Sequence, residues 1–260
     1  MGAGQLFELF RASRDHARTV FMPFMTAGIP DAGKSLGVFE ELAEAGADAF
    51  EVGIPYSDPL MDGPVIQAAS TRALAGGMTF GGGLDLAGEV AKSTGLPVIV
   101  MTYVNPILQI GPEEFAGQAR MAGVAGVIIA DVPFEESMLI KVALDDVGIG
   151  IAMFAAPTTT EERLRSIAGA EPAFIYAVAD MGVTGRRDQL RSDLRGMVRR
   201  IRAVTSIPMV LGVGISTPDQ AREASQLADG VIVGSALVSE VMESGGVPSA
   251  EAFADAVHAG

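Results

Sequence analysis

Residues 208–234 read PMVLGVGISTPDQAREASQLADGVIVG, a stretch that predicts one complete strand–helix–strand unit. Pro208–Val213 and Asp229–Gly234 are almost continuous apolar runs, as expected for parallel strands that are covered on both faces. Between them, Ser216-Thr217-Pro218-Asp219 places hydroxyl groups ahead of a proline and an acid, which is typical of the start of a helix, here Pro218–Leu227.

Comparable apolar runs recur along the chain and predict eight strands: Val20–Thr26, Ala49–Ile54, Pro97–Tyr103, Gly126–Asp131, Gly150–Ala155, Phe174–Ala179, Pro208–Val213 and Asp229–Gly234. Helical patterns are visible over Leu6–Ala12, Leu36–Ala45, Glu113–Met121, Glu136–Val147, Thr160–Ala168, Leu194–Val204 and Pro218–Leu227. Eight such units in 260 residues favour an α/β fold of the (β/α)8 TIM barrel class, with an open doubly wound sheet as the alternative. Because no linker or break in composition is visible, we expect residues 1–260 to form a single barrel domain.

Two of the strand-to-strand intervals are long, those after the second and the sixth strand. They contain Pro55–Pro64 and Asp180–Arg195. In a barrel both loops lie at the C-terminal ends of the strands, where catalytic residues are found. The uncharged window Ser93–Pro112 contains several prolines, so we interpret it as a buried strand with its loop and not as a membrane span.

The composition excludes several classes of chemistry. The chain has no Cys and only two His, His16 and His258, which excludes thiolate catalysis and Cys-based metal sites and argues against a Ser-His-Asp triad. The net charge of −14 opposes nonspecific binding to nucleic acid or to anionic membranes. Because no secretory signal is visible, we expect a cytoplasmic protein with no nucleic-acid and no membrane partner.

Residues Gly28–Ser35 fit the phosphate-binding pattern G-x-x-x-x-G-K-[ST] and follow a predicted strand. Asp131, at the end of an apolar strand, resembles the magnesium-binding Asp of nucleotide hydrolases. However, Pro30 removes a backbone N–H that a phosphate cradle needs, and Asp31 would place a carboxylate against the phosphates. The simpler interpretation is that Asp31 caps a helix and Lys34 is solvated. A nucleotide-binding P-loop protein is kept as the less favoured alternative for the function of the chain.

Residues 48–64, DAFEVGIPYSDPLMDGP, contain two carboxylates with an unusual placement. Glu51 lies within an apolar strand, where an unpaired carboxylate is costly. Either an Arg from Arg186–Arg202 pairs with it, or it is a carboxyl with a raised pKa at the barrel mouth, suited to proton transfer. Asp62 lies on the following proline-rich loop, where it is either a second functional carboxylate or an ordinary turn residue before Gly63.

Paired glycine motifs follow the last two strands, Gly212-Val-Gly214-Ile-Ser216 and Val233-Gly234-Ser235-Ala236. Small residues there let backbone N–H groups approach a ligand, and this is the usual phosphate position of such barrels, although tight turns also use Gly. None of the three lysines lies in a predicted strand, which argues against Schiff-base cleavage, and the shortage of His argues against a zinc aldolase. Of the reaction classes considered, acid–base catalysis by carboxylates on a phosphate-bearing substrate is the one that remains.

The motifs resemble those of the tryptophan synthase alpha subunit family along nearly the whole chain. The matching segments are Phe21–Gly28, Glu51–Pro64 with Ile66-Gln67, Met101–Pro106, Ala130–Pro133, Gly182–Gly185, Gly214–Ser216 and Gly234-Ser235. The resemblance implies retro-aldol cleavage of indole-3-glycerol phosphate to indole and D-glyceraldehyde 3-phosphate, with indole passed to the beta subunit. It implies no metal and no cofactor in this chain, pyridoxal phosphate in the partner beta subunit, and an α2β2 assembly.

Carried over onto this sequence, the resemblance makes Glu51 the general acid–base and Asp62 the residue that hydrogen-bonds the indole N–H. It also assigns phosphate binding to Gly185, Val213, Gly214, Gly234 and Ser235; the indole pocket to Phe24, Tyr103, Ile128 and Tyr176; a lid role to Thr184; and partner contacts to Asp58 and Pro59. Arg186 and Arg187 would add positive charge near the entrance or simply be solvated.

The sequence departs from the family pattern at two places. Ala179-Asp180 stands where many relatives have Ser, and Val213 replaces an aromatic residue of some members. These departures bear on lid closure and on packing near the phosphate. Two further alternatives share the same motifs, a free-standing indole-3-glycerol-phosphate lyase without a partner and a catalytically inactive regulatory subunit.

Overall fold

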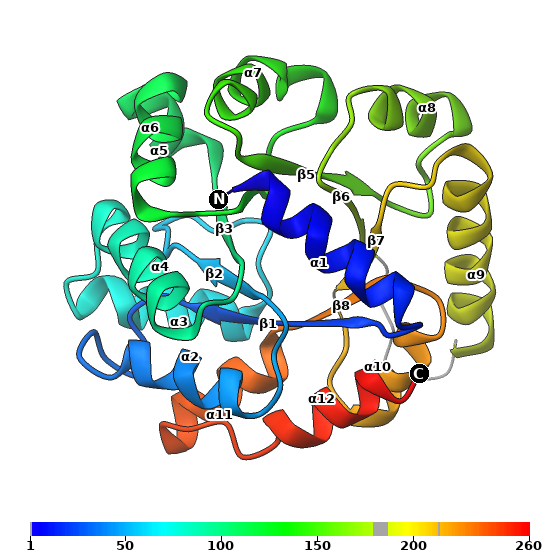
Figure 1. Cartoon of the computed structure of the whole chain (residues 1–260). Helices are drawn as coiled ribbons and strands as arrows, with labels where there is room; N and C mark the ends of the chain where they lie inside the picture. Colours follow the sequence, from blue (N-terminus) through cyan, green and yellow to red (C-terminus); the bar gives the residue numbers. More distant parts are fainter. Residues whose placement is uncertain (1, 179–186, 213) are drawn as a thin grey trace.

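The computed structural model describes residues 2–178, 187–212 and 214–260, and in the second range the side chains from residue 194 onward. Eight parallel strands close into a barrel in chain order, and helices surround it (Figure 1). β8 returns to pair with β1, with Val20 opposite Gly230, so the sheet has no free edge. The predicted (β/α)8 barrel is confirmed and the open sheet was wrong. That residues 1–260 form a single domain stays a prediction.

The strands match the predicted apolar runs to within two residues at each end. They are β1 (Val20–Thr26), β2 (Phe50–Gly53), β3 (Val98–Thr102), β4 (Gly126–Ile129), β5 (Gly150–Ala155), β6 (Phe174–Val178), β7 (Met209–Gly212) and β8 (Gly230–Val233). Nearly every strand residue is buried, because one face lines the barrel interior and the other is covered by helices. Because both faces are buried, apolar and polar residues do not alternate along these strands, and the strands appear in the sequence as continuous apolar runs.

The helices of the described residues include all seven that were predicted and five that were not. They are α1 (Ala3–Asp15), α2 (Ser35–Glu44), α3 (Pro64–Ala75), α4 (Phe80–Thr94), α5 (Val104–Ile110), α6 (Pro112–Ala122), α7 (Met138–Asp146), α8 (Glu161–Gly169), α9 (Arg187–Val204), α10 (Pro218–Ser225), α11 (Ser235–Ser244) and α12 (Ala250–His258), with a 3-10 turn at Phe134–Glu136. Thr160 and Thr217 cap α8 and α10 through their side chains, as their positions predicted.

Two predictions about loops were wrong. The window 93–112 is not only a strand and its loop, because α5 occupies most of its second half. The interval Asp180–Arg195 is not all loop either, because α9 begins at Arg187, seven residues before the predicted start. The first turns of α9 are rich in charged residues, and this polarity hid the helix from a search for apolar spacing.

The helix α4 was missed because it contains four glycines, which lower helix propensity. Two of them are needed for close packing. A Cβ on Gly83 would lie 3.1 Å from side-chain atoms of Ile54, and one on Gly88 would lie 2.8 Å from the carbonyl oxygen of Ala122. The small residues therefore let α4 lie tightly between the end of β2 and the end of α6.

The N-terminal helix α1 lies across the end of the barrel where the strands begin (Figure 1). Its Leu6 and Phe10 are buried, and the Phe10 ring lies 6.0 Å from that of Phe174 at the start of β6. A Cβ on Gly126 would lie only 2.8 Å from Leu6, so a glycine at the start of β4 makes room for this apolar plug. With this end closed, the C-terminal ends of the strands are the open end of the barrel.

Within the described residues, no helix combines the length and apolar character needed to cross a bilayer.

Candidate active site

Glu51 lies in the middle of β2, and its side chain is almost fully buried, with 1% of its surface exposed. Its Oε2 atom has no hydrogen-bond partner among the described residues. Burial raises the pKa of the carboxyl to about 8, and the nearby charge of Asp62 contributes further. Glu51 is therefore mainly protonated at neutral pH and can donate a proton.

The sequence left open whether an Arg from Arg186–Arg202 pairs with Glu51. Among the side chains that the structure describes, none of the arginines forms an ion pair with this carboxylate. Arg202, for example, pairs with Asp229 at 2.8 Å, at the opposite end of the barrel. The described part of the chain thus supports a neutral carboxyl and not a buried ion pair.

The strand register places the predicted pocket residues on one inner face. Phe24 on β1 is paired with Glu51. Gly53, two residues further on and so on the same face, is paired with Met101, which is paired with Ile128 on β4. The charge of Glu51 acts on Tyr176 although β2 and β6 lie on opposite sides of the barrel, so both side chains point into its interior. Phe24, Glu51, Ile128 and Tyr176 therefore line a common space.

Asp62 follows β2 and is half-buried at the mouth of the barrel. Burial raises the pKa of its carboxyl to about 6, and a hydrogen bond with the hydroxyl of Tyr103 opposes this shift. The same hydroxyl accepts the backbone N–H of Met61 at 3.1 Å. Tyr103, predicted only as a pocket wall, thus also fixes the loop that carries Asp62.

A further aromatic residue, Tyr56, was missed in the sequence. Its ring stacks on Tyr103, with the centroids 5.0 Å apart and the planes inclined by 24°. Asn105 Nδ2 donates a hydrogen bond to the Tyr56 hydroxyl at 3.2 Å and so joins the start of α5 to this loop. A tyrosine between two prolines in the loop that carries Asp62 was the signal that could have identified it.

Aromatic rings form the apolar walls of the inner space. Tyr176 is buried, and its pKa is raised well above the usual value, first by burial and then by the charges of Glu51 and Asp62. Its ring packs 5.2 Å from that of Phe154, a wall residue that was not predicted. The Phe24 ring fills the space above Gly53, where a Cβ would lie 2.5 Å from Phe24 Cζ. Flat, apolar walls of this kind suit an aromatic ligand.

The predicted phosphate residues that are described lie after β7 and β8. Gly234 precedes α11 and is in contact with the site, since a Cβ placed on it would lie 3.4 Å from Phe24 Cδ1. Ser235 is the first residue of α11, and the backbone N–H groups of a first helical turn have no partner within the helix. Gly214 has a φ of 73°, which favours glycine at this turn. These backbone groups could hold an anion beside the aromatic walls.

Several predicted residues lie outside the described part of the chain. They are Thr184, Gly185, Val213, Ala179, Asp180 and Arg186, and the side chain of Arg187. Asp58 and Pro59 are described and lie on the loop between β2 and α3, where Asp58 is exposed.

The P-loop alternative does not fit the geometry of Gly28–Ser35. The Ser35 hydroxyl is buried and accepts the backbone N–H of Gly28 at 3.0 Å, so it is already engaged within the loop. Lys34 is largely exposed and pairs with Asp31 at 3.3 Å. Asp31 accepts the N–H of Lys34 in the turn that leads into α2, although the helix itself begins only at Ser35. Asp131 accepts the N–H of Val104 at the start of α5.

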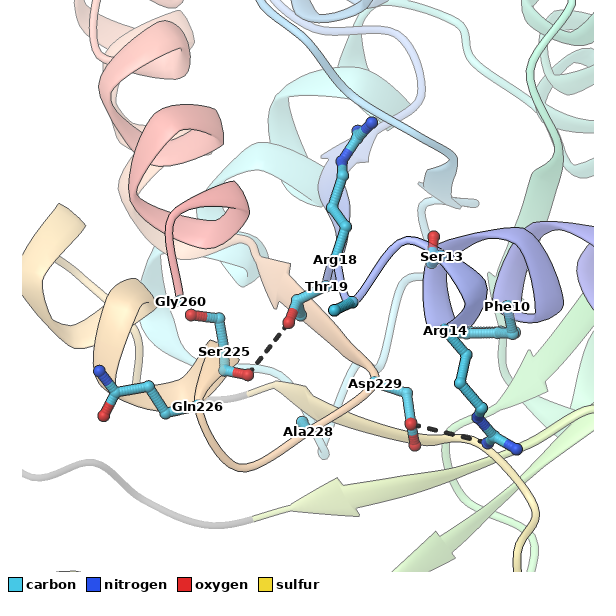
Figure 2. Close-up of a pocket in the computed structure, with 11 residues that line it drawn as sticks. Phe10, Ser13, Arg14, Arg18, Thr19, Ser225, Gln226, Ala228, Asp229 and Gly260 are labelled. Atoms are coloured by element: carbon cyan, nitrogen blue, oxygen red, sulfur yellow. Dashed lines mark hydrogen bonds and ion pairs between the residues drawn. The ribbon is translucent and has the colours of Figure 1, made fainter.

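A cavity of about 410 Å³ lies at the other end of the barrel, between the end of α1 and the segment before β8 (Figure 2). Its charged side chains, Arg14, Arg18 and Asp229, and the hydroxyls of Thr19 and Ser225 already have partners within the chain. Arg14 pairs with Asp229 at 3.7 Å, and the Thr19 hydroxyl donates to the carbonyl oxygen of Ser225 at 3.0 Å (Figure 2). The mouth at the C-terminal ends, which holds a buried carboxyl without a partner, is therefore the better candidate site.

A closed barrel with two carboxyls of raised pKa at its mouth has the architecture of a barrel enzyme that works by acid–base chemistry. Residues 10–257 match the model of the family described as tryptophan synthase alpha chain, and the chain belongs to this family of lyase subunits. A tryptophan synthase alpha chain from Gloeobacter violaceus is 44% identical over 236 residues, covering 90% of this chain and 86% of the relative. One from Geobacillus kaustophilus is 43% identical over 223 residues, covering 85% and 83%.

Solved structures agree with this assignment. A crystal structure of tryptophan synthase from M. tuberculosis, in an aminoacrylate- and BRD0059-bound form, matches with a TM-score of 0.89 and 34% identity, covering 98% of this chain and 99% of that chain. A tryptophan synthase subunit alpha from Legionella pneumophila matches with a TM-score of 0.87 and 31% identity, covering 99% and 98%.

The burial of Glu51 predicts how stability depends on pH. The unfolded chain releases the Glu51 proton near the ordinary value of 4.5, whereas the folded chain keeps it up to about 8. As the pH rises between these two values, the free energy of unfolding falls by about 1.4 kcal/mol for each pH unit, because only the folded chain still holds the proton. Glu51→Gln removes this titration, so its advantage in free energy of unfolding over wild type should grow from pH 5 to pH 8 and then level off. Urea unfolding at each pH measures this difference, and a constant difference would contradict the assignment.

Proposed function

We propose that this chain catalyses the cleavage of indole-3-glycerol phosphate to indole and D-glyceraldehyde 3-phosphate. The observation that carries the proposal is the buried Glu51 carboxyl, neutral at physiological pH, facing aromatic walls at the barrel mouth. Between pH values of about 6 and about 8, Glu51 is protonated while Asp62 is ionised. One group can then donate a proton while the other stabilises positive charge.

The proposed reaction begins with the transfer of the Glu51 proton to indole C3. The ring becomes an indolenine-like cation, and the Asp62 carboxylate accepts the hydrogen bond of the ring N–H, where positive charge develops. The Glu51 carboxylate then takes the proton of the side-chain hydroxyl next to the ring. The bond from C3 to the side chain breaks, its electron pair returns to the ring, and the carbon that held the hydroxyl becomes the aldehyde. Glu51 ends protonated, as it began.

Substrate binding in this proposal uses the remaining site residues. Phe24, Tyr103, Ile128 and Tyr176 hold the indole ring, and the backbone at Gly214, Gly234 and Ser235 holds the phosphate. Backbone N–H groups bind an anion without a cluster of cationic side chains, so a net charge of −14 does not oppose a phosphorylated substrate. Gly185 and Val213 as phosphate residues, and Thr184 as a lid residue that contacts Asp62, are proposed from the family resemblance alone.

The proposed chemistry uses only side chains and backbone groups of this chain. We therefore propose that it works without a metal or an organic cofactor, and that pyridoxal phosphate belongs to a partner beta subunit. Because the substrate and one product carry a phosphate and do not cross a membrane unaided, we also propose that the reaction takes place in the cytoplasm.

We propose that the beta subunit docks on the loop after β2 and on α5, in an α2β2 assembly. Leu60 and Met61 are 79% and 64% exposed on that loop, beside the predicted contacts Asp58 and Pro59. Leu108 on α5 is 55% exposed, and the Asn105–Tyr56 hydrogen bond joins α5 to the loop. Large exposed apolar side chains on adjoining segments are typical of a protein interface.

Removal of either carboxyl should stop or severely reduce the reaction. Glu51→Gln keeps the size of the side chain but cannot transfer a proton, so indole release should fall below detection. Asp62→Ala leaves the proton donor intact but removes the stabilisation of ring charge, and we expect a loss of about 10²- to 10³-fold in kcat. Indole release from indole-3-glycerol phosphate measures both variants. Turnover like that of wild type in either one would overturn the proposed function.

A charge placed in the docking surface should weaken the assembly. Leu108→Asp should lower the affinity for the beta subunit about 10- to 100-fold, because burying a leucine contributes about 1.5–3 kcal/mol. Met121→Asp is the matched control, since Met121 is 81% exposed on α6, outside this surface. Titration calorimetry with the beta subunit of the same organism measures both variants. Unchanged binding of Leu108→Asp would refute this surface, and full activity without measurable beta-subunit binding would favour the free-standing lyase.

A further inference from the structure

Three buried side-chain oxygens in the described part of the chain have no hydrogen-bond partner: Thr26 Oγ1, Glu51 Oε2 and Ser249 Oγ. Ser249 precedes the outer helix α12. The other two belong to neighbouring strands, β1 and β2, and both side chains have 1% of their surface exposed. Thr26 has no role in the reaction proposed above, and the sequence did not identify it.

The register places the Thr26 side chain on the inner face of the barrel, one step above Glu51. Phe24 is paired with Glu51, and Thr26 is paired with Gly53, two residues further toward the mouth. Strands about 4.8 Å apart with a rise of about 3.3 Å per residue put the Cβ atoms of Thr26 and Glu51 about 8 Å apart. From this separation the two side chains can extend toward one another, so that one hydroxyl bound between them can make a hydrogen bond of about 2.8 Å to each.

A buried hydroxyl without a partner costs roughly 1–3 kcal/mol relative to one that is hydrogen-bonded. Valine has almost the same shape as threonine and would fill this position in an apolar barrel without that cost. None of the described contacts therefore gives the Thr26 hydroxyl a stabilising role. A ligand that reaches Glu51 would satisfy both oxygens at once.

We propose that the Thr26 hydroxyl binds the side-chain hydroxyl of the substrate at the carbon next to the indole ring, opposite Glu51. This assignment rests on the proposed function. The indole N–H is directed to Asp62 and the phosphate to the turns after β7 and β8, so the two side-chain hydroxyls are the substrate groups left. The one on the carbon next to the ring is the one whose proton Glu51 takes in the proposed reaction, and it therefore lies in the space above Glu51. A threonine hydroxyl can donate to that oxygen while the proton of the substrate hydroxyl faces the Glu51 carboxylate.

The hydrogen bond has a chemical consequence as well as a positional one. When Glu51 takes the hydroxyl proton, negative charge develops on the oxygen that becomes the aldehyde oxygen. A donor fixed on this oxygen stabilises the charge in the transition state more than in the bound substrate. Thr26 is thus a substrate-binding residue whose loss should lower kcat as well as raise KM.

The test compares Thr26→Val, Thr26→Ser and Thr19→Val in steady-state kinetics and thermal unfolding. Thr26→Val should lower kcat/KM about 10- to 100-fold while Tm stays the same or rises, because an unpartnered hydroxyl is replaced by a methyl group of similar size. Thr26→Ser keeps the hydroxyl and should restore most of the activity. Thr19 is a matched control just before β1, where its buried hydroxyl donates to Ser225 (Figure 2), so Thr19→Val should lower Tm and leave the kinetics unchanged.

A substrate analogue tests whether Thr26 acts on a side-chain hydroxyl of the substrate. An indole propyl phosphate, which lacks both side-chain hydroxyls, should bind Thr26→Val as tightly as wild type in a calorimetric titration. A wild-type kcat/KM in Thr26→Val, a lack of rescue by Thr26→Ser, or equal weakening of analogue binding would each overturn the assignment. Full activity of Glu51→Gln would instead overturn the proposed function, so the two failures are distinguishable.

Discussion

The burial of one carboxyl group without a counter-charge is the constraint on which the rest of this site depends. Glu51 lies on a central part of β2, inside a closed sheet whose inner walls are apolar and aromatic. An ionised carboxylate there would lose the solvation of water without gaining a partner, so the group keeps its proton up to a pH of about 8. The same interior that makes the barrel stable thus prepares an acid for catalysis.

The second carboxyl has a different environment because it is placed by side chains and not by a strand. Asp62 is held at the mouth through Tyr103, which also binds the backbone of Met61 and stacks on Tyr56. Its pKa, raised only to about 6, leaves it ionised when Glu51 is protonated. Two carboxyls of one chain can therefore take opposite roles at the same pH, and their placement, deep in a strand or on a braced loop, decides which role each takes.

The two ends of the barrel have different roles, one stabilising the fold and the other holding the candidate active site. At the end where the strands begin, α1 inserts Leu6 and Phe10, and beside the cavity of Figure 2 Arg14 pairs with Asp229 and Thr19 with the carbonyl of Ser225. At the other end, buried oxygens on Glu51 and Thr26 have no partner among the described residues. Unsatisfied polar groups are costly, so two of them on neighbouring strands inside the barrel indicate that this end serves function at a cost in stability.

The sequence predicted most of the features that arise from continuous apolar runs and from glycine turns, because these patterns are local. It located the eight strands, Glu51 within one of them, and the turns at Gly214 and Gly234. It missed α4, whose glycines serve packing against Ile54 and Ala122. It also missed Tyr56 and Phe154, whose roles depend on contacts with Tyr103 and Tyr176, which are distant in the sequence. Thr26 was hidden for the same reason, since a threonine in a strand is ordinary until its missing hydrogen bond is visible. The roles of Thr184, Gly185 and Val213 stay predictions.

The protonation state of Glu51 decides whether this carboxyl can act as the acid of the reaction. Infrared difference spectra between wild type and Glu51→Gln, recorded across a pH titration, isolate the carbonyl band of this one carboxyl. We expect a protonated carboxyl band at pH 7 that disappears with a midpoint near 8. A carboxylate band already complete at pH 6 would contradict it, because an ionised Glu51 could not supply the proton with which the proposed reaction begins.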